Sequence, residues 1–211
     1  MNDTAIPLPA PDKAQPHSVL AVLEKRQSTW EISDEPLPRQ VLANLLWAAY
    51  GVNRHSGPLG SPGRTAGAAT NVREIDVYVA LKSGAYLYNA MENRLEIVNK
   101  RDLRLQALLP DQRSTHPPAA VELIFVADVG RFAEAPGFDQ PERQDPEVQK
   151  SYYFVDTGFI AANVYVYAAA VGLAAWFHDC DKAALGWQLG LKLEQRVLFA
   201  QSVGYREDGE D

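Results

Sequence analysis

The segment Lys25 to Ser28 places two cations beside an amide and a hydroxyl, a combination that suits a phosphate group. Arginine binds phosphate through two parallel N–H groups, and a serine hydroxyl can donate a further hydrogen bond. Cations also complement the negative carboxyl end of a helix, so they need no ligand to explain them. The residue types alone favour this second interpretation over a phosphate site.

The segment His178 to Asp181 carries a histidine, a cysteine and two aspartates in consecutive positions. Neighbouring residues rarely converge on one metal ion, and the chain has no other paired His or Cys spacing, so we expect no metal site. Cys180 is not expected to act as a nucleophile, because flanking aspartates raise the pKa of a thiol. Phosphate-cradling glycine loops, dinucleotide fingerprints and serine elbows are absent from the sequence, and no residue is indicated as catalytic.

An apolar helix is predicted to position these groups. Residues Phe159 to Val171 are apolar on nearly every face, which predicts a helix at the centre of the domain with other elements packed on all sides. Asp156 is expected to cap its amino end, and Gly172 to end it in a left-handed turn. The helix is too short and too rich in alanine for a convincing membrane span. Its carboxyl end delivers a strand or loop, Leu173 to Asp179, to a fixed place.

The first third of the chain is predicted to hold an arm, two helices and a long loop. Residues 1–17 contain four prolines and should form an extended arm. Ser18 is expected to cap a short helix, and Pro38 to begin a second helix that Gly51 ends. The run Asn53 to Asn71 is rich in Gly, Pro, Ser and Thr; we expect it to contain no regular element and to be functional or disordered.

Strands are predicted in the rest of the chain. Apolar and polar residues alternate from Ile75 to Leu81, which predicts a strand with two unlike faces, and a hairpin should follow at 83–98. The apolar run 120–128 predicts a strand buried on both faces. Residues 133–150 are polar and broken by prolines, which favours an excursion or lid. The remaining predicted elements are a short helix at 182–189 and a last strand at 196–203.

Composition is that of an ordinary soluble globular protein. With 211 residues, 46% of them hydrophobic and 22% charged, the chain can bury one full core, so residues 18–211 are interpreted as a single domain. The net charge is −7 and basic residues are scattered, which argues against nucleic acid or an anionic membrane as a partner. A single cysteine favours a reducing compartment, and the amino terminus lacks a signal-peptide pattern, so we expect a cytoplasmic protein.

Five segments of the sequence point together to one family. They are KRQSTWEISDEPLP, LLWAAYGVNR, GRTAGAATNVREIDVYVAL, DTGFIAANVYVYAAAVGLAAWF and QRVLFAQSVGY. In this order the chain resembles the nitroreductase-like flavoproteins from about Ile6 to Tyr205, especially the branch related to thiazoline and oxazoline oxidases. The resemblance implies an α+β fold with a central mixed or antiparallel sheet between helices. It also implies an intertwined homodimer with FMN bound in its interface.

The resemblance assigns three segments and two single residues to FMN. Residues 26–28 match the grip on the phosphate and ribityl chain, and residues 67–71 match a loop that reaches the flavin from the partner subunit. Residues 176–179 match the segment beside the isoalloxazine ring, where a backbone N–H commonly faces N5. The residues so assigned are Arg26, Gln27, Ser28, Trp30, Gly67, Ala68, Ala69, Asn71, Trp176, Phe177, His178, Asp179 and Arg206.

Several of these positions depart from the family pattern. Gln27 and Trp30 stand where basic residues are usual, and Gly67-Ala68 replaces a usual Pro-Ser pair. Beyond Gly-Tyr near the carboxyl end, Arg206 is followed by EDGED rather than by further basic residues. These departures predict either a weaker hold on FMN or a loss of redox work.

The resemblance implies an FMN-dependent oxidoreductase in which NAD(P)H reduces the flavin and an electron-poor acceptor, such as a nitro compound or quinone, reoxidises it. The flavin would supply the hydride chemistry, and the protein its position and electrostatic surroundings. An alternative is a flavin-fold protein that binds or shelters a flavin or another flat ligand without turnover. A purely structural dimer would leave the Asn53 to Asn71 loop without a task.

Overall fold

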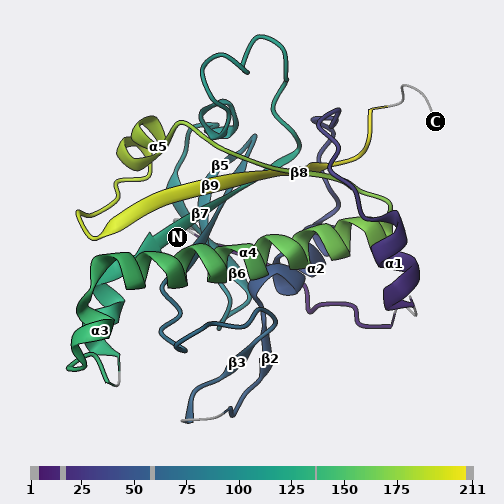
Figure 1. The fold of residues 1–211 in the computed structure, drawn as a ribbon. Coiled ribbons are helices and arrows are strands. Elements are labelled where there is room, and N and C mark those ends of the chain that lie inside the picture. Colours follow the sequence, from purple (N-terminus) through teal and green to yellow (C-terminus); the bar gives the residue numbers. More distant parts are fainter. Residues whose placement is uncertain (1–4, 15–17, 58–59, 136, 208–211) are drawn as a thin grey trace.

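The computed structural model describes residues 5–14, 18–57, 60–135 and 137–207. Within these ranges the chain forms a seven-stranded sheet in the order β1-β6-β5-β4-β7-β9-β8, with every pairing antiparallel, and a separate ribbon of β2 and β3 (Figure 1). The strands are β1 (Ala5–Pro7), β2 (Val52–Arg54), β3 (Gly63–Arg64), β4 (Ile75–Leu81), β5 (Gly84–Asn89), β6 (Arg94–Asn99), β7 (Val121–Asp128), β8 (Ala174–His178) and β9 (Gln195–Gly204).

Helices cover both faces of the seven-stranded sheet. The helices are α1 (Val19–Lys25), α2 (Arg39–Tyr50), α3 (Pro141–Gln144), α4 (Pro146–Val171) and α5 (Lys182–Gln188), with 3-10 turns η2 (Arg104–Ala107) and η3 (Val129–Glu134). The largest core cluster joins α2 and α4 to one face, and a second joins α5 and η2 to the other. This arrangement confirms the predicted α+β fold with a sheet between helices.

The elements with the clearest apolar period lie where the sequence predicts them. Helix α2 begins after Pro38 and ends at Gly51, and β4 and the β5–β6 hairpin follow their alternation. Strand β7 is buried on both faces as predicted, although it includes Glu122, a carboxylate with no exposed surface. A charged residue in such a strand must have partners, because an unpaired buried charge is costly.

Helix α4 begins eleven residues earlier than predicted. Asp145 caps it by accepting the N–H of Glu147 at 2.9 Å, and Pro146 occupies the first turn. Asp156 is therefore not a cap but a buried residue in the middle of the helix, and 146–150 are not part of an excursion. An aspartate before proline is a strong helix start, which outweighed the polar composition of the first turns. Gly172, with φ of 75°, ends the helix in the predicted left-handed turn.

Helix α4 is not covered on every side by its own chain. Val155 and Phe159 are each about half exposed, and a third of the most apolar 18-residue window is buried. At 26 residues α4 is long and apolar enough to cross a membrane by those criteria alone, so the prediction that it is too short is wrong. Its other side packs on α2, β4, β8 and β9, as the core helix of a folded domain does.

Two regions predicted to be irregular contain short strands. Within the predicted arm, Ala5–Pro7 pairs with β6 and extends the sheet; residues 1–4 and 15–17 lie outside the described residues. The run from Asn53 to Asn71 is not free of regular structure, because it includes most of the β2–β3 ribbon. Ribbon pairing of so few residues leaves no apolar period to detect in the sequence.

Candidate functional site

A cleft of about 780 Å³ opens between the end of α1 and the carboxyl half of α4. Its polar wall combines Lys25, Arg26 and Gln27 with Arg206 from the end of the chain. The segment after α1 runs beside the carboxyl-terminal residues, with Ser33 N–H donating to Tyr205 O at 2.9 Å and Ile32 bridging Arg206. This pairing brings two distant predicted segments, 26–28 and Arg206, to one concave surface. The floor is formed by small residues of α4 and its end, Ala168, Ala169 and Gly172.

Tyr165 of α4 joins the phosphate-grip segment to strand β8. Its hydroxyl oxygen accepts the backbone N–H of Phe177 at 2.8 Å and lies 2.9 Å from Ser28 Oγ. Because the N–H of Phe177 supplies one hydrogen, the tyrosine proton is free to point at Ser28. The Arg26 guanidinium sits 5.3 Å from the centre of the same ring, and Thr29 N–H donates to Ala175 O at 2.9 Å. Tyr165 was not predicted as a site residue, because it stands among many apolar residues in the sequence.

A buried polar chain fixes the end of β8 against the sheet. His178 Nε2 lies 2.8 Å from Ser202 Oγ on β9, and that hydroxyl donates to Glu122 Oε2 on β7 at 2.7 Å. The other ring nitrogen lies 2.8 Å from Asp179 O; a carbonyl oxygen only accepts, so Nδ1 donates. Glu122 Oε1 accepts Ala119 N–H at 3.0 Å. His178 is thus committed to holding the predicted flavin segment in place.

Residues 67–71 lie apart from this cleft, over the amino half of α4. The backbone N–H of Ala69 donates to Asp156 Oδ1 at 2.9 Å. Tyr165 is nine residues further along the same helix, about 14 Å at 1.5 Å per residue. Gly67, Ala68 and Asn71 line a cavity of about 250 Å³ instead. One chain therefore does not bring the two predicted halves of the flavin site together.

The remaining predicted residues have individual surroundings. Trp30 is 57% exposed, so its ring is not part of the core. Asp179 pairs with Lys182 at 2.6 Å, and Asp181 caps α5 and pairs with Arg113 at 2.8 Å. Burial raises the pKa of the Cys180 thiol to about 12, with the flanking aspartates adding to it as predicted. Among the described residues, no group of three or more His, Cys, Asp or Glu side chains is arranged to hold a metal ion.

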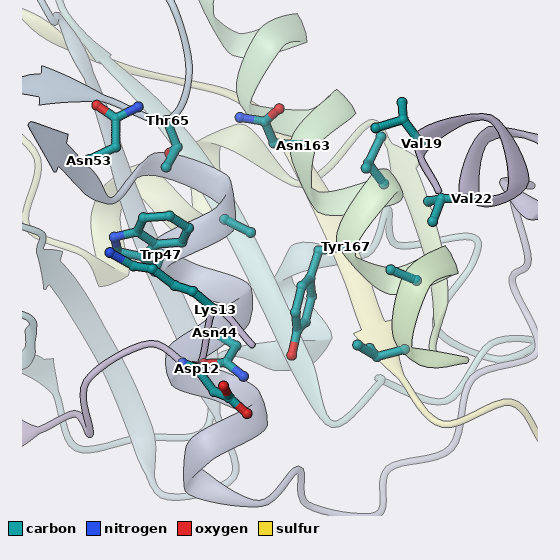
Figure 2. Close-up of a pocket in the computed structure, with 14 residues that line it drawn as sticks. Asp12, Lys13, Val19, Val22, Asn44, Trp47, Asn53, Thr65, Asn163 and Tyr167 are labelled. Carbon is teal, nitrogen blue, oxygen red and sulfur yellow. Dashed lines mark hydrogen bonds between the residues drawn. The ribbon is translucent and has the colours of Figure 1, made fainter. Parts of the chain in front are cut away.

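A second cavity, of about 400 Å³, was not anticipated from the sequence. It lies between the amino-terminal arm, α1, α2 and α4, and none of the predicted site residues lines it. Figure 2 shows Lys13 lying along the Trp47 ring, with its ammonium 4.7 Å from the ring centre, and Tyr167 on the facing helix. Tyr167 Oη donates to Val41 O at 3.3 Å, which ties α4 to α2 at this point.

Comparison with known proteins gives a consistent result. Residues 23–205 match the model of the nitroreductase family. A Methanocaldococcus jannaschii protein that carries the name of a nitroreductase is 31% identical over 196 residues, covering 87% of this chain and 88% of its own. A Ralstonia eutropha crystal structure with the same kind of name is 33% identical with a TM-score of 0.85, covering 98% of this chain and 91% of that one.

A more distant structure shares the fold. The NADPH:FMN oxidoreductase of Vibrio harveyi, solved in complex with NAD⁺, superposes with a TM-score of 0.62 at 18% identity. The match covers 90% of this chain and 69% of that one.

Proposed function

Because the chain belongs to the nitroreductase family, we propose that it is an FMN-dependent oxidoreductase that works as a homodimer in the cytoplasm. The observation that carries this proposal is the cleft at the carboxyl half of α4. There Arg26, Ser28 and β8 are held together by one residue, Tyr165. The fold shared with an FMN oxidoreductase supports the same cofactor.

The cleft has the donor set that a phosphate needs. Three cations, Lys25, Arg26 and Arg206, line it against one carboxylate, Glu24, and Gln27 adds an amide. Ala168 and Gly172 leave the floor free of long side chains, so a ribityl phosphate can approach the helix closely. Arg26 is already oriented by the Tyr165 ring, which limits the rotamer entropy lost on binding.

Strand β8 carries aromatic side chains on both of its faces. Phe177 packs against Phe199 on the face toward α4, with ring centres 4.8 Å apart, and Trp176 packs against His178 on the opposite face at 4.3 Å. Bound FMN would supply hydride transfer between NAD(P)H and an electron-poor acceptor such as a nitro compound or quinone. The chain's own part is to hold the ring beside β8 and to exclude water with these aromatic side chains.

An apolar stripe of α4, exposed at Val155, Phe159 and Ala162 and half-buried at Val166, supports the homodimer. Val155, Phe159, Ala162 and Val166 are spaced four, three and four residues apart, so they share one face of the helix. The stripe is symmetric about residues 160–161. An antiparallel second copy on a two-fold axis there would place Val155 against the partner's Val166 and Phe159 against the partner's Ala162.

The same axis explains the separation of the two site halves. It places Asp156 of one chain opposite the partner's Tyr165, because their positions are also symmetric about residues 160–161. Residues 67–71, anchored on Asp156, would then reach the partner's cleft. Val19, Leu20 and Leu23 of α1 are also exposed and extend the apolar surface that a second copy would cover.

Purification without added flavin tests the function. We expect a yellow dimer whose flavin is released as FMN on denaturation and is reduced by NADH or NADPH, with reoxidation by a quinone. A colourless dimer that binds added FMN but does not oxidise NAD(P)H would favour the second candidate, a flavin-binding protein without turnover. Trp30 and Gly67-Ala68, where the family pattern has a cation and Pro-Ser, favour that candidate. A monomer without affinity for FMN would contradict both.

A further inference from the structure

Two carboxyl groups meet in the interior beneath residues 67–71. Glu74, directly before β4, is 0% exposed, and Asp156, in the middle of α4, is 2% exposed. No N–H or O–H donor in the described part of the chain reaches either Glu74 oxygen or Asp156 Oδ2. The two side chains lie close enough for the negative charge of Asp156 to raise the pKa of Glu74. Two carboxyl groups this close can share a hydrogen bond only when one of them keeps its proton.

The surroundings favour the protonated form. Burial, together with the nearby charge of Asp156, raises the pKa of Glu74 to about 7. Burial also raises the pKa of Asp156. Two adjacent buried carboxylates cannot both ionise without a large electrostatic cost, so Glu74 keeps its proton until the pH rises through about 7.

The cations around the pair are committed to other partners. Arg131 of η3 binds both Asp76 oxygens at 2.7 and 2.9 Å, and Arg64 of β3 lies 4.9 Å from the Tyr50 ring centre. Arg73 donates to Ser61 Oγ at 2.9 Å. Tyr50 of α2 stays neutral, because burial raises its pKa. Within the described ranges no salt bridge involves Glu74 or Asp156, which leaves a shared proton as the means of stabilising the pair.

A hydrogen bond connects the pair to residues 67–71, the loop that is proposed to face the flavin. Asp156 Oδ1 accepts the N–H of Ala69 at 2.9 Å. The backbone that follows is strained, since Asn71 and Arg73 adopt left-handed φ angles of 57° and 60° without being glycine. A strained segment relaxes when its anchor weakens, so the geometry of this loop depends on Asp156.

We propose that Glu74 and Asp156 are positioning residues that hold residues 67–71 in their flavin-binding geometry by sharing one proton, and that loss of this proton releases the loop. This inference rests on the proposed function, in which the loop reaches the partner's FMN. Flavin affinity should then fall as the pH rises through neutrality. Neither residue touches the flavin in this account; both act through Ala69.

Flavin titrations at pH 6 and pH 8 test the proposal. With a pKa of about 7 the protonated fraction of Glu74 falls from about nine-tenths to about one-tenth, so the Kd should rise about tenfold. Riboflavin is the better ligand here, because the FMN phosphate itself titrates near pH 6. The Glu74→Gln variant keeps a neutral donor to Asp156 and cannot lose a proton, so its Kd should be the same at both pH values. Equal pH profiles for the two proteins would overturn the proposal.

Hydrogen exchange of the flavin-free wild-type protein provides an independent test that needs no variant. Protection of the Ala69 amide, corrected for intrinsic exchange, should fall about tenfold from pH 6 to pH 8 as the protonated pair is lost. Unchanged protection would refute the carboxyl pair as the anchor. Loss of protection in a protein that binds no flavin would instead confirm the pair and refute the proposed function.

Discussion

The two halves of helix α4 anchor two different kinds of surface. At the carboxyl half, Tyr165 holds an exposed, cationic segment through its hydroxyl group. In the amino half, Asp156 holds a strained loop from the interior through a carboxylate. One helix thus orders both halves of the proposed flavin site, and its two anchors, Asp156 and Tyr165, are about 14 Å apart along the helix axis. If the proposed site is composite, each half should be separable by mutation.

The largest loss of dimer stability and FMN affinity is expected from a charge in the apolar stripe of α4 between Asp156 and Tyr165. Phe159→Asp puts a charge at the centre of the proposed interface, which an apolar partner surface cannot solvate. We expect a monomer at micromolar concentration with no measurable FMN binding, by sedimentation and fluorescence titration. Leu193→Asp, at a 96% exposed apolar position in the connection between α5 and β9, is the matched control and should remain a dimer. A dimeric Phe159→Asp protein with normal FMN affinity would show that this stripe is not the interface.

Removing the cation at the Tyr165 end should have the next largest effect. Arg26→Ala removes a charge-assisted contact to the phosphate, which corresponds to a tenfold to hundredfold loss of FMN affinity, about 1.5–3 kcal/mol. Riboflavin, which has no phosphate, should bind nearly as before. Arg101→Ala, another exposed arginine, serves as the control for net charge. Equal losses for FMN and riboflavin would assign Arg26 to structure instead.

Adding a cation near the cleft at Tyr165 should tighten FMN binding. Trp30→Arg places a donor where the family resemblance expects one near the flavin pyrimidine edge, and we expect about tenfold tighter FMN binding and a higher reduction potential. Trp30 is 57% exposed, so an arginine there need not be buried without a partner. Trp187→Arg, at an 84% exposed position, controls for the added charge. Unchanged or weaker binding by a folded Trp30→Arg protein would contradict the role of this position.

Tyr165→Phe should produce the smallest change. It removes one hydroxyl that serves both Ser28 and the Phe177 amide, at a cost of about 0.5–1.5 kcal/mol, which is a twofold to tenfold loss of FMN affinity. Tyr167→Phe, two residues further on the same helix, loses a similar hydrogen bond to Val41 outside the cleft. FMN binding should be unaffected in that variant. Identical behaviour of the two variants would show that Tyr165 does not organise the cleft.

The helices and strands could be predicted from the sequence better than the polar residues that hold the candidate site in place. Periodic apolar residues located α2, β4 and β7, because burial of one or both faces leaves a repeating pattern. The start of α4 was missed because its first turns carry polar side chains, and the cap at Asp145 outweighed composition. Sequence position could not reveal that Asp156 would meet Glu74, since their contact depends on how α4 crosses the sheet.

The sequence-based prediction also omitted polar residues that lie within apolar segments and hydrogen-bond to distant parts of the chain. Tyr165 and Glu122 each stand in a run that reads as core, and their roles follow from residues far away in the chain, Ser28 and Ser202. A polar residue inside a buried segment is the signal that could have identified them, because buried polar groups need partners. The family resemblance supplied the predicted flavin residues, and the structure shows that these lie in two separate places.

Mixed dimers test the composite site most directly. Arg26→Ala damages the half of the site at Tyr165, whereas Gly67→Trp adds bulk to the loop at a position where an added Cβ meets no neighbour within 4 Å in its own chain. Each variant alone should bind FMN poorly. Coexpressed with two affinity tags, the mixed dimer should carry one site with both defects and one intact site, and so bind one FMN per dimer with wild-type affinity. Failure to recover any wild-type site in the mixed dimer would contradict a flavin site shared between two chains.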